Sequence, residues 1–160
     1  MAQKLAKRSL CSRDQVGAII VDANQKVIGE GYNGPPKNFW HNSESCVNWC
    51  ARAAEQGKKE RDYSDCPSLH AEANALMMSD RSLRRGGTIY VTSHTCMGCA
   101  KLISNSGIVR VVVAAVAEHE HRRSDSTYLW LIKLGIPVMV NGVYFGEVIT
   151  AAKGWVRSES

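Results

Sequence analysis

Four residues at two places in the chain have the types and spacing of a metal-assisted catalytic site. His70 and Glu72 are separated by one residue, and Cys96 and Cys99 form the closely spaced pair C-x-x-C. One imidazole and two thiolates are three protein ligands for zinc, which favours tetrahedral coordination and keeps a fourth position for water in catalytic sites. Glu72 would stand beside the ion without ligating it, as a proton-transferring residue should. We therefore predict a catalytic zinc at His70, Cys96 and Cys99, with Glu72 as the catalytic residue.

Each half of this arrangement, taken alone, has an ordinary explanation. A single H-x-E occurs often by chance, and an isolated C-x-x-C is also typical of a redox pair or of half a structural zinc site. The two together are more specific, because each is expected at the start of a helix and one strand lies between them. A helix N-terminus also favours the thiolate, which is the metal-binding form of cysteine.

Strands and helices alternate around these residues. Apolar and β-branched runs predict strands over Val16–Val21, Lys26–Tyr32, Ile89–Thr92, Val109–Val116 and Ile136–Val140. Helices are predicted over His70–Met78, Met97–Asn105 and Asp125–Leu134. The first two strands form a hairpin, and the run 109–116 indicates a strand buried on both faces. The alternation predicts an α/β layered domain with a partly parallel sheet, and a further short hairpin is expected after Asn141.

The composition fits one globular domain spanning residues 1–160. The hydrophobic fraction of 44% and the charged fraction of 22% argue against global disorder. The longest apolar run, Val111–Ala117, is far too short to span a bilayer. The basic N-terminus lacks the apolar core of a secretory signal, so we expect a cytoplasmic protein. A net charge of +5 favours anionic ligands, either a phosphorylated small molecule or a nucleic acid, and also serves ordinary solubility.

The remaining cysteines suggest a second metal site. In a reducing compartment they are expected to be thiols or metal ligands rather than disulfides. Four thiolates can close a structural zinc site, and His41 could replace one of them. Such a site would hold the insert 33–67, which is long and without clear periodicity for a compact domain. The alternative is that some are merely small buried side chains. These residues are Cys11, Cys46, Cys50 and Cys66.

Several blocks of the chain resemble the deoxycytidylate (dCMP) deaminase branch of the cytidine deaminase superfamily. H-x-E followed by C-x-x-C is the signature of zinc deaminases of nucleobases, except that the signature has proline where this chain has Thr95. Threonine can cap a helix, so we expect the change to be tolerated. A second departure is the divergent stretch Ala117–Tyr128. The resemblance runs from about Ala6 to Gly142 and includes Val16–Ile20, Gly31–Gly34, His70–Ala75, Ile89–Thr92, Cys99–Ile103 and Ser106–Ile108.

The resemblance implies a fold and an activity. The fold would have three layers, with a five-stranded mixed sheet between helices. The activity would be the zinc-dependent hydrolysis of dCMP to dUMP and ammonia, feeding thymidylate nucleotide synthesis, with Glu72 moving protons between the attacking water, N3 of the base and the leaving amine. The resemblance also implies a homo-oligomer, with a hexamer favoured. It implies activation by dCTP with Mg²⁺ and inhibition by dTTP.

Four residues are expected to bind the nucleotide. Asn33 matches a family asparagine that contacts the sugar, and the backbone N–H of Ala71 is offered to the base by the start of a helix. Arg81 matches a phosphate-contacting arginine in its spacing from the histidine. Tyr128 could stack on or cover the nucleotide, although a buried core aromatic is the favoured interpretation of both Tyr128 and Trp130. Other candidates for the phosphate are Arg13, Arg84 and Arg85.

Two other interpretations of the sequence stay open. One is a deaminase of a C5-modified cytosine nucleotide or of a base within a polynucleotide. The chain lacks the stripe of aromatic and basic residues that follows single strands, so nucleic acid is not the expected partner. The other is a non-catalytic zinc-binding module that kept the fold. Glu72 argues against such a module, because a structural site has no need of a non-ligating carboxylate there.

Overall fold

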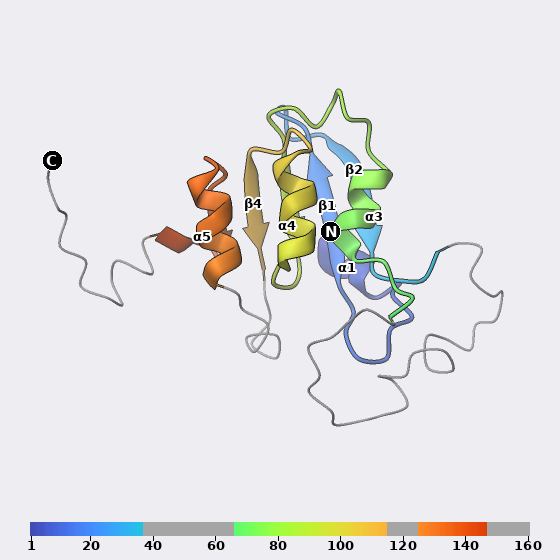
Figure 1. Ribbon diagram of the computed structural model, residues 1–160. Helices are drawn as coiled ribbons and strands as arrows, with labels where there is room; N and C mark the ends of the chain where they lie inside the picture. The colour runs from blue at the N-terminus through green and yellow to red at the C-terminus, as the bar shows by residue number, and fades with distance from the viewer. Residues whose placement is uncertain (37–65, 115–124, 147–160) are drawn as a thin grey trace, which may run out of the picture.

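The computed structural model describes residues 1–36, 66–114 and 125–146, which build a mixed sheet with helices on both faces (Figure 1). The predicted α/β layered architecture is confirmed. Within the described ranges no helix is long and apolar enough to cross a membrane. The elements, in chain order, are α1 (Ala2–Ala6), β1 (Gly17–Val21), β2 (Val27–Tyr32), α3 (Ala71–Met77), β3 (Thr88–Val91), α4 (Met97–Ser104), β4 (Arg110–Val113), α5 (Asp125–Lys133), β5 (Val138–Val140) and β6 (Val143–Tyr144).

The sheet has the strand order β2-β1-β3-β4-β5-β6 and mixes both pairing directions. β1 pairs antiparallel with β2 and with β3, whereas β3, β4 and β5 run parallel. The described sheet has six strands, one more than expected. Asn141 and Gly142 have φ of 49° and 87°, the left-handed conformations of a tight hairpin turn, and this turn returns β6 antiparallel to β5. A short hairpin is expected from Asn141 onward, but the observed hairpin begins earlier, because β5 is its first strand and Asn141 lies in its turn.

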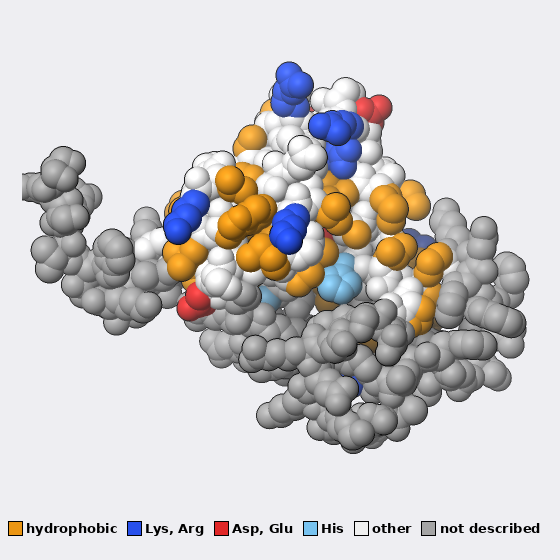
Figure 2. Space-filling model, viewed as in Figure 1, with side chains coloured by type: hydrophobic (Ala, Val, Ile, Leu, Met, Phe, Trp, Pro, Cys, Tyr) orange, Lys and Arg blue, Asp and Glu red, His pale blue; other side chains and the backbone are white. Residues whose placement is uncertain are grey.

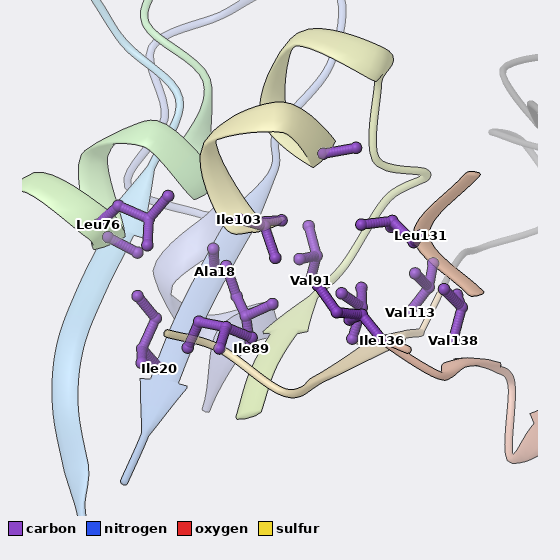
Figure 3. Close-up of a cluster of buried hydrophobic side chains, with 14 of the residues drawn as sticks. Ala18, Ile20, Leu76, Ile89, Val91, Ile103, Val113, Leu131, Ile136 and Val138 are labelled. Atoms are coloured by element: carbon purple, nitrogen blue, oxygen red, sulfur yellow. The ribbon is translucent and has the colours of Figure 1, made fainter. Parts of the chain in front are cut away.

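Alternating side chains along the strands separate two hydrophobic layers. On one face, Ala18 and Ile20 of β1 join the apolar side chains of β3, β4 and β5 under α3, α4 and α5, a cluster shown in Figure 3. On the other face, Ile19 and Val21 pack against Leu5 of α1. Helices therefore cover both faces of the sheet, and the three-layer arrangement is confirmed.

Two details of the packing differ from the prediction. Residues of β4 alternate between buried and half-buried, so the second face of this strand is not closed as its apolar sequence indicated. Helix α1 was not predicted, because five residues are too few to show a helical period. Gly135 follows α5 with φ of 77° and confirms the predicted end of that helix.

Helix α3 lies unusually close to β2. A β-carbon on Gly31 would lie 2.3 Å from the carbonyl oxygen of Ala71 and 2.4 Å from the backbone nitrogen of Ala75. Only glycine leaves room for this approach, and it places the first turn of α3 directly on the end of β2. The amide of Asn74 donates from Nδ2 to the carbonyl oxygen of Tyr32 at 2.8 Å, which holds the helix in that position.

Candidate active site

His70 is fixed from both sides at the start of α3. The preceding Leu69 exchanges two backbone hydrogen bonds with Gly34, at 2.8 and 3.1 Å. His70 itself is the N-cap residue, with an extended backbone, and its carbonyl oxygen accepts the bond from the backbone N–H of Asn74. The imidazole of His70 makes no capping hydrogen bond to this helix, so capping does not prevent it from binding a metal.

The two cysteines stand at the start of α4, directly after β3. Thr92 anchors the end of β3, because its N–H donates to Gly17 and its hydroxyl accepts from the N–H of Gly17 at 2.9 Å. Four residues later Cys96 is the N-cap of α4, and its sulfur accepts from the N–H of Cys99 at 3.4 Å. The expectation that Thr95 caps this helix is wrong. Thr95 lies one residue before the cap, and its buried hydroxyl has no hydrogen-bond partner among the described residues.

Helices α3 and α4 meet because both begin at one edge of the sheet. Tyr32, the last residue of β2, pairs with Gly17, and Val91, the last residue of β3, pairs with Ala18. The carboxyl ends of β2 and β3 therefore lie beside the start of β1. In open α/β sheets, ligands bind at the carboxyl edge of the parallel strands.

The ligand atoms converge as the sequence predicted. Nδ1 of His70 lies 3.5 Å from Sγ of Cys96 and 3.4 Å from Sγ of Cys99, and all three ligand atoms lie within 4.8 Å of one another. A tetrahedral zinc with ordinary Zn–N and Zn–S bond lengths separates nitrogen and sulfur by about 3.6 Å. The donor set and its spacing therefore fit zinc. No other group of three or more potential ligands with this spacing occurs in the described part of the chain.

The protonation of the two sulfurs suits the binding of a cation. A hydrogen bond from Cys99, with a further one from His70, lowers the pKa of Cys96 to about 4. The pKa of Cys99 is raised, because its thiol donates to Cys96 and is buried. Cys96 is thus the sulfur that gives up its proton more readily, and metal binding removes the proton of Cys99 as well.

Glu72 is a buried carboxyl next to the ligands. Its side chain is 3% exposed, and burial raises its pKa above the usual value, although its own backbone N–H and the nearby His70 act in the opposite direction. A carboxyl whose pKa is raised by burial holds a proton more readily than an exposed one, which suits the proton-transferring role predicted for Glu72.

Two of the predicted nucleotide-binding residues lie at the same edge of the sheet. Asn33 follows β2 and joins two segments, because its Oδ1 accepts from the N–H of Val16 and its Nδ2 donates to the carbonyl oxygen of Asp14, each at 2.8 Å. Ala71 begins α3 and is fully buried against β2. Asn33 therefore shapes the entry to β1, and contacts of these two residues with sugar and base stay predictions.

Arg81 is not brought to His70 within the chain. It lies beyond the opposite end of α3, a helix whose seven residues rise about 10 Å. Lys and Arg side chains gather over this turn at the top of Figure 2. The neighbouring Arg84 donates to the carbonyl oxygen of Leu76 and so completes the end of α3, whereas Arg85 is exposed. The sequence missed Arg8, whose guanidinium lies 5.1 Å above the ring of Tyr32, at the edge that carries the ligands.

Tyr128 is completely buried in α5. Its hydroxyl lies 2.5 Å from Nδ1 of His94, and its ring packs edge-on against Phe145 with the centroids 4.9 Å apart. Trp130 is half-buried against the main core. The sequence did not single out His94, whose partner lies 34 positions away along the chain.

The second metal site falls mostly beyond the described part of the chain. Cys11 and Cys66 are half-buried free thiols. His41, Cys46 and Cys50 lie outside the described residues, as does most of the predicted insert. The four-cysteine site therefore stays a prediction.

Comparison with known proteins places these residues in a family context. The family described as "Cytidine and deoxycytidylate deaminase zinc-binding region" matches residues 1–115. A deoxycytidylate deaminase of Mycobacterium phage D29 is 40% identical over 116 residues, covering 70% of this chain and 87% of that protein. The human deoxycytidylate deaminase is 32% identical over 131 residues, covering 82% and 70%. The crystal structure of dCMP deaminase from the cyanophage S-TIM5 with dCMP and dUMP is 28% identical, with a TM-score of 0.62 over 87% of this chain and 90% of that one.

Proposed function

The chain belongs to the cytidine and deoxycytidylate deaminase family, and from this premise we propose that it hydrolyses dCMP to dUMP and ammonia. The observation that carries the proposal is the buried carboxyl of Glu72 beside a His-Cys-Cys set with the spacing of a zinc site. Relatives named deoxycytidylate deaminase, and the similar structure that holds dCMP and dUMP, favour this substrate over a base in a polynucleotide or a non-catalytic module.

The chemistry divides between the metal and the protein. His70, Cys96 and Cys99 would hold zinc, which when bound supplies Lewis-acid activation of water. Glu72 takes a proton from the attacking water and gives it to N3 of the pyrimidine. It then takes the proton of the new hydroxyl on C4 and delivers it to the amino group, which leaves as ammonia as the C4–N bond breaks and the C4 carbonyl forms. Burial of this carboxyl raises its pKa above the usual value and so favours the protonated form that returns the proton.

The substrate is tested with a panel of nucleotides. Purified zinc-loaded protein is assayed for ammonia release from dCMP, 5-methyl-dCMP, 5-hydroxymethyl-dCMP, CMP, deoxycytidine and a cytosine-containing single-stranded oligonucleotide. The proposal predicts the highest kcat/KM for dCMP and much weaker turnover of deoxycytidine, which lacks the phosphate. If the zinc-loaded protein released no ammonia from any mononucleotide, the proposal would be contradicted.

Two arginines are candidates for the phosphate. Arg81 has the family spacing, whereas Arg8 lies at the ligand-bearing edge of the sheet, over Tyr32. The geometry within one chain supports Arg8, and Arg81 would have to reach a site from another copy. Arg8→Ala and Arg81→Ala distinguish them, because loss of the phosphate contact raises the KM for dCMP and leaves the weak turnover of deoxycytidine unchanged.

Assembly into a homo-oligomer, with a hexamer favoured, is a further part of the proposal. Large apolar side chains are exposed along the helices on one face of the sheet, and Figure 2 shows apolar side chains spread over this face. Exposed apolar surface of this kind is typical of protein interfaces. Light scattering of Leu102→Glu tests the surface, and a smaller species than the unaltered protein is expected. The exposed residues are Met77, Met78, Leu102, Leu129 and Leu134.

Regulation, the second metal and cellular location complete the proposal. The family resemblance supports activation by dCTP with Mg²⁺ and inhibition by dTTP. A cytoplasmic location also belongs to the proposal. A structural zinc at Cys11, Cys46, Cys50 and Cys66 predicts two zinc ions per chain, falling to one when Cys66 is replaced by serine. Elemental analysis and kinetics with each effector test these points. One zinc per chain, or rates unchanged by both effectors, would contradict the corresponding part.

A further inference from the structure

The short loop from β3 to α4 carries one of the three ligands. It leaves the sheet at Thr92, which is bonded to Gly17, and reaches Cys96 four residues later. Two of its three intervening side chains, Ser93 and Thr95, bury hydroxyls that have no partner among the described residues. The third, His94, makes a polar side-chain contact with Tyr128 that ties this loop to α5.

The partner of His94 is itself firmly held. The hydroxyl of Tyr128 meets Nδ1 of His94 at 2.5 Å, and the two rings lie 5.9 Å apart between centroids. The ring of Tyr128 is completely buried and packs edge-on against Phe145, which is 1% exposed. Neighbouring residues on α5, Thr127 and Leu131, are equally buried. The hydroxyl of Tyr128 is therefore held in place by the core, and His94, which is only half-buried, is the partner that it can position.

We propose that His94 and Tyr128 are a positioning pair for the deamination. The bond from the buried Tyr128 to His94 holds the loop that presents Cys96, so that the sulfur keeps its place relative to His70 and Glu72. Tyr128 then acts through His94 and not by covering the nucleotide. The proposal rests on the deaminase activity proposed above. Groups that orient metal ligands from behind typically change metal affinity or activity by about 10- to 100-fold when they are altered.

The first test removes one oxygen atom. Tyr128→Phe keeps the buried ring and its packing on Phe145 but loses the bond to His94. We expect kcat for dCMP to fall about 10- to 100-fold while KM changes less than about threefold. In the cobalt-substituted protein, the visible absorption bands, which report ligand geometry, should shift. A kcat within about twofold of the unaltered protein, with an unshifted spectrum, would overturn the proposal.

The second test separates the two nitrogens of His94 and does not depend on the core tolerating a change. Asparagine places a polar atom near the position of Nδ1, whereas glutamine places one near Nε2. If the bond to Tyr128 is what matters, His94→Asn retains most of kcat and His94→Gln loses it. The reverse order would show that His94 acts through its other nitrogen, and the positioning role would be wrong.

The outcome separates this proposal from the activity on which it rests. If the unaltered zinc-loaded protein fails to release ammonia from dCMP, the proposed function fails. If it is active and Tyr128→Phe and His94→Gln match it, only the positioning pair fails. Combining Tyr128→Phe with His94→Gln gives a further check, because two changes that break one bond should cost little more together than either alone.

Discussion

Replacing Gly31 by alanine tests whether the contact of β2 with α3 sets the geometry of the site. The new β-carbon would lie 2.3 Å from the carbonyl oxygen of Ala71 and 2.4 Å from the backbone nitrogen of Ala75. Ordinary contact requires about 3.5 Å, so the first turn of α3 must move by about 1 Å. Both obstructing atoms belong to the backbone, so no side-chain rotation can relieve the contact.

That displacement reaches the ligands directly. His70 caps the same helix, and its Nδ1 lies 3.4 and 3.5 Å from the two sulfurs, so a movement of about 1 Å exceeds the tolerance of about 0.2 Å expected of a metal site. We expect Gly31→Ala to lower the free energy of unfolding by about 3 kcal/mol and kcat by about 100-fold. Urea denaturation, zinc content per chain and ammonia release from dCMP measure the three consequences.

Gly34 provides a matched control three residues further on. Among the described residues, a β-carbon there would meet only the ring of Tyr32, at 4.0 Å, and the hydrogen bonds of Gly34 with Leu69 involve backbone atoms. Gly34→Ala should therefore keep zinc and stay within about twofold of the normal rate. The reasoning is refuted if Gly31→Ala retains full zinc and activity, or if the two alanine variants lose them equally.

Asn33→Ala removes two buried hydrogen bonds and should lower the free energy of unfolding by about 2–4 kcal/mol in urea titrations, whereas a loss under about 0.5 kcal/mol would mean that these bonds add nothing. The pKa of the Asp80 carboxyl is lowered because it accepts from the hydroxyl and the N–H of Ser82. The ionised Asp80 carboxylate therefore contributes fully to the free energy of unfolding above its unfolded pKa. This contribution is lost as the pH falls through the lower pKa of the folded state. The stability advantage over Asp80→Asn should shrink between pH 7 and about pH 3 in chemical denaturation, and an advantage that does not change with pH would rule this out. Removing metal with a chelator should lower the midpoint temperature of thermal unfolding, and adding zinc but not magnesium should restore it. An unchanged midpoint after chelation would contradict stabilisation of the fold by a metal.

The metal cluster could be predicted from sequence because residue type and local structure agree there. H-x-E and C-x-x-C each fall at a helix start, and the alternation of strands with helices brings those starts to one edge of the sheet. The position of Thr95 could not be predicted equally well. The sequence allowed it a capping role, but the sulfur of Cys96 takes the bond from the N–H of Cys99.

Contacts between distant segments could not be predicted in this way. The bond of His94 to Tyr128 depends on where α5 crosses the sheet, and neither residue type nor spacing indicates it. The two hydrogen bonds of the Asn33 side chain before β1 could not be predicted either, because an asparagine in a turn gives no sign in the sequence of which groups its amide will bind. Arg81 was chosen by spacing along the chain, and the length of α3 then placed it at the opposite end from His70.

The central claim is that Glu72 transfers protons beside a metal that it does not ligate. The most direct test compares the zinc-loaded protein with Glu72→Gln, which keeps the shape of the side chain but cannot accept or release the proton. Ammonia release from dCMP and zinc content per chain are measured on the same samples. The account predicts a loss of turnover of at least about 10³-fold with zinc content unchanged. Turnover that survives the substitution, or zinc that is lost with it, would contradict the account.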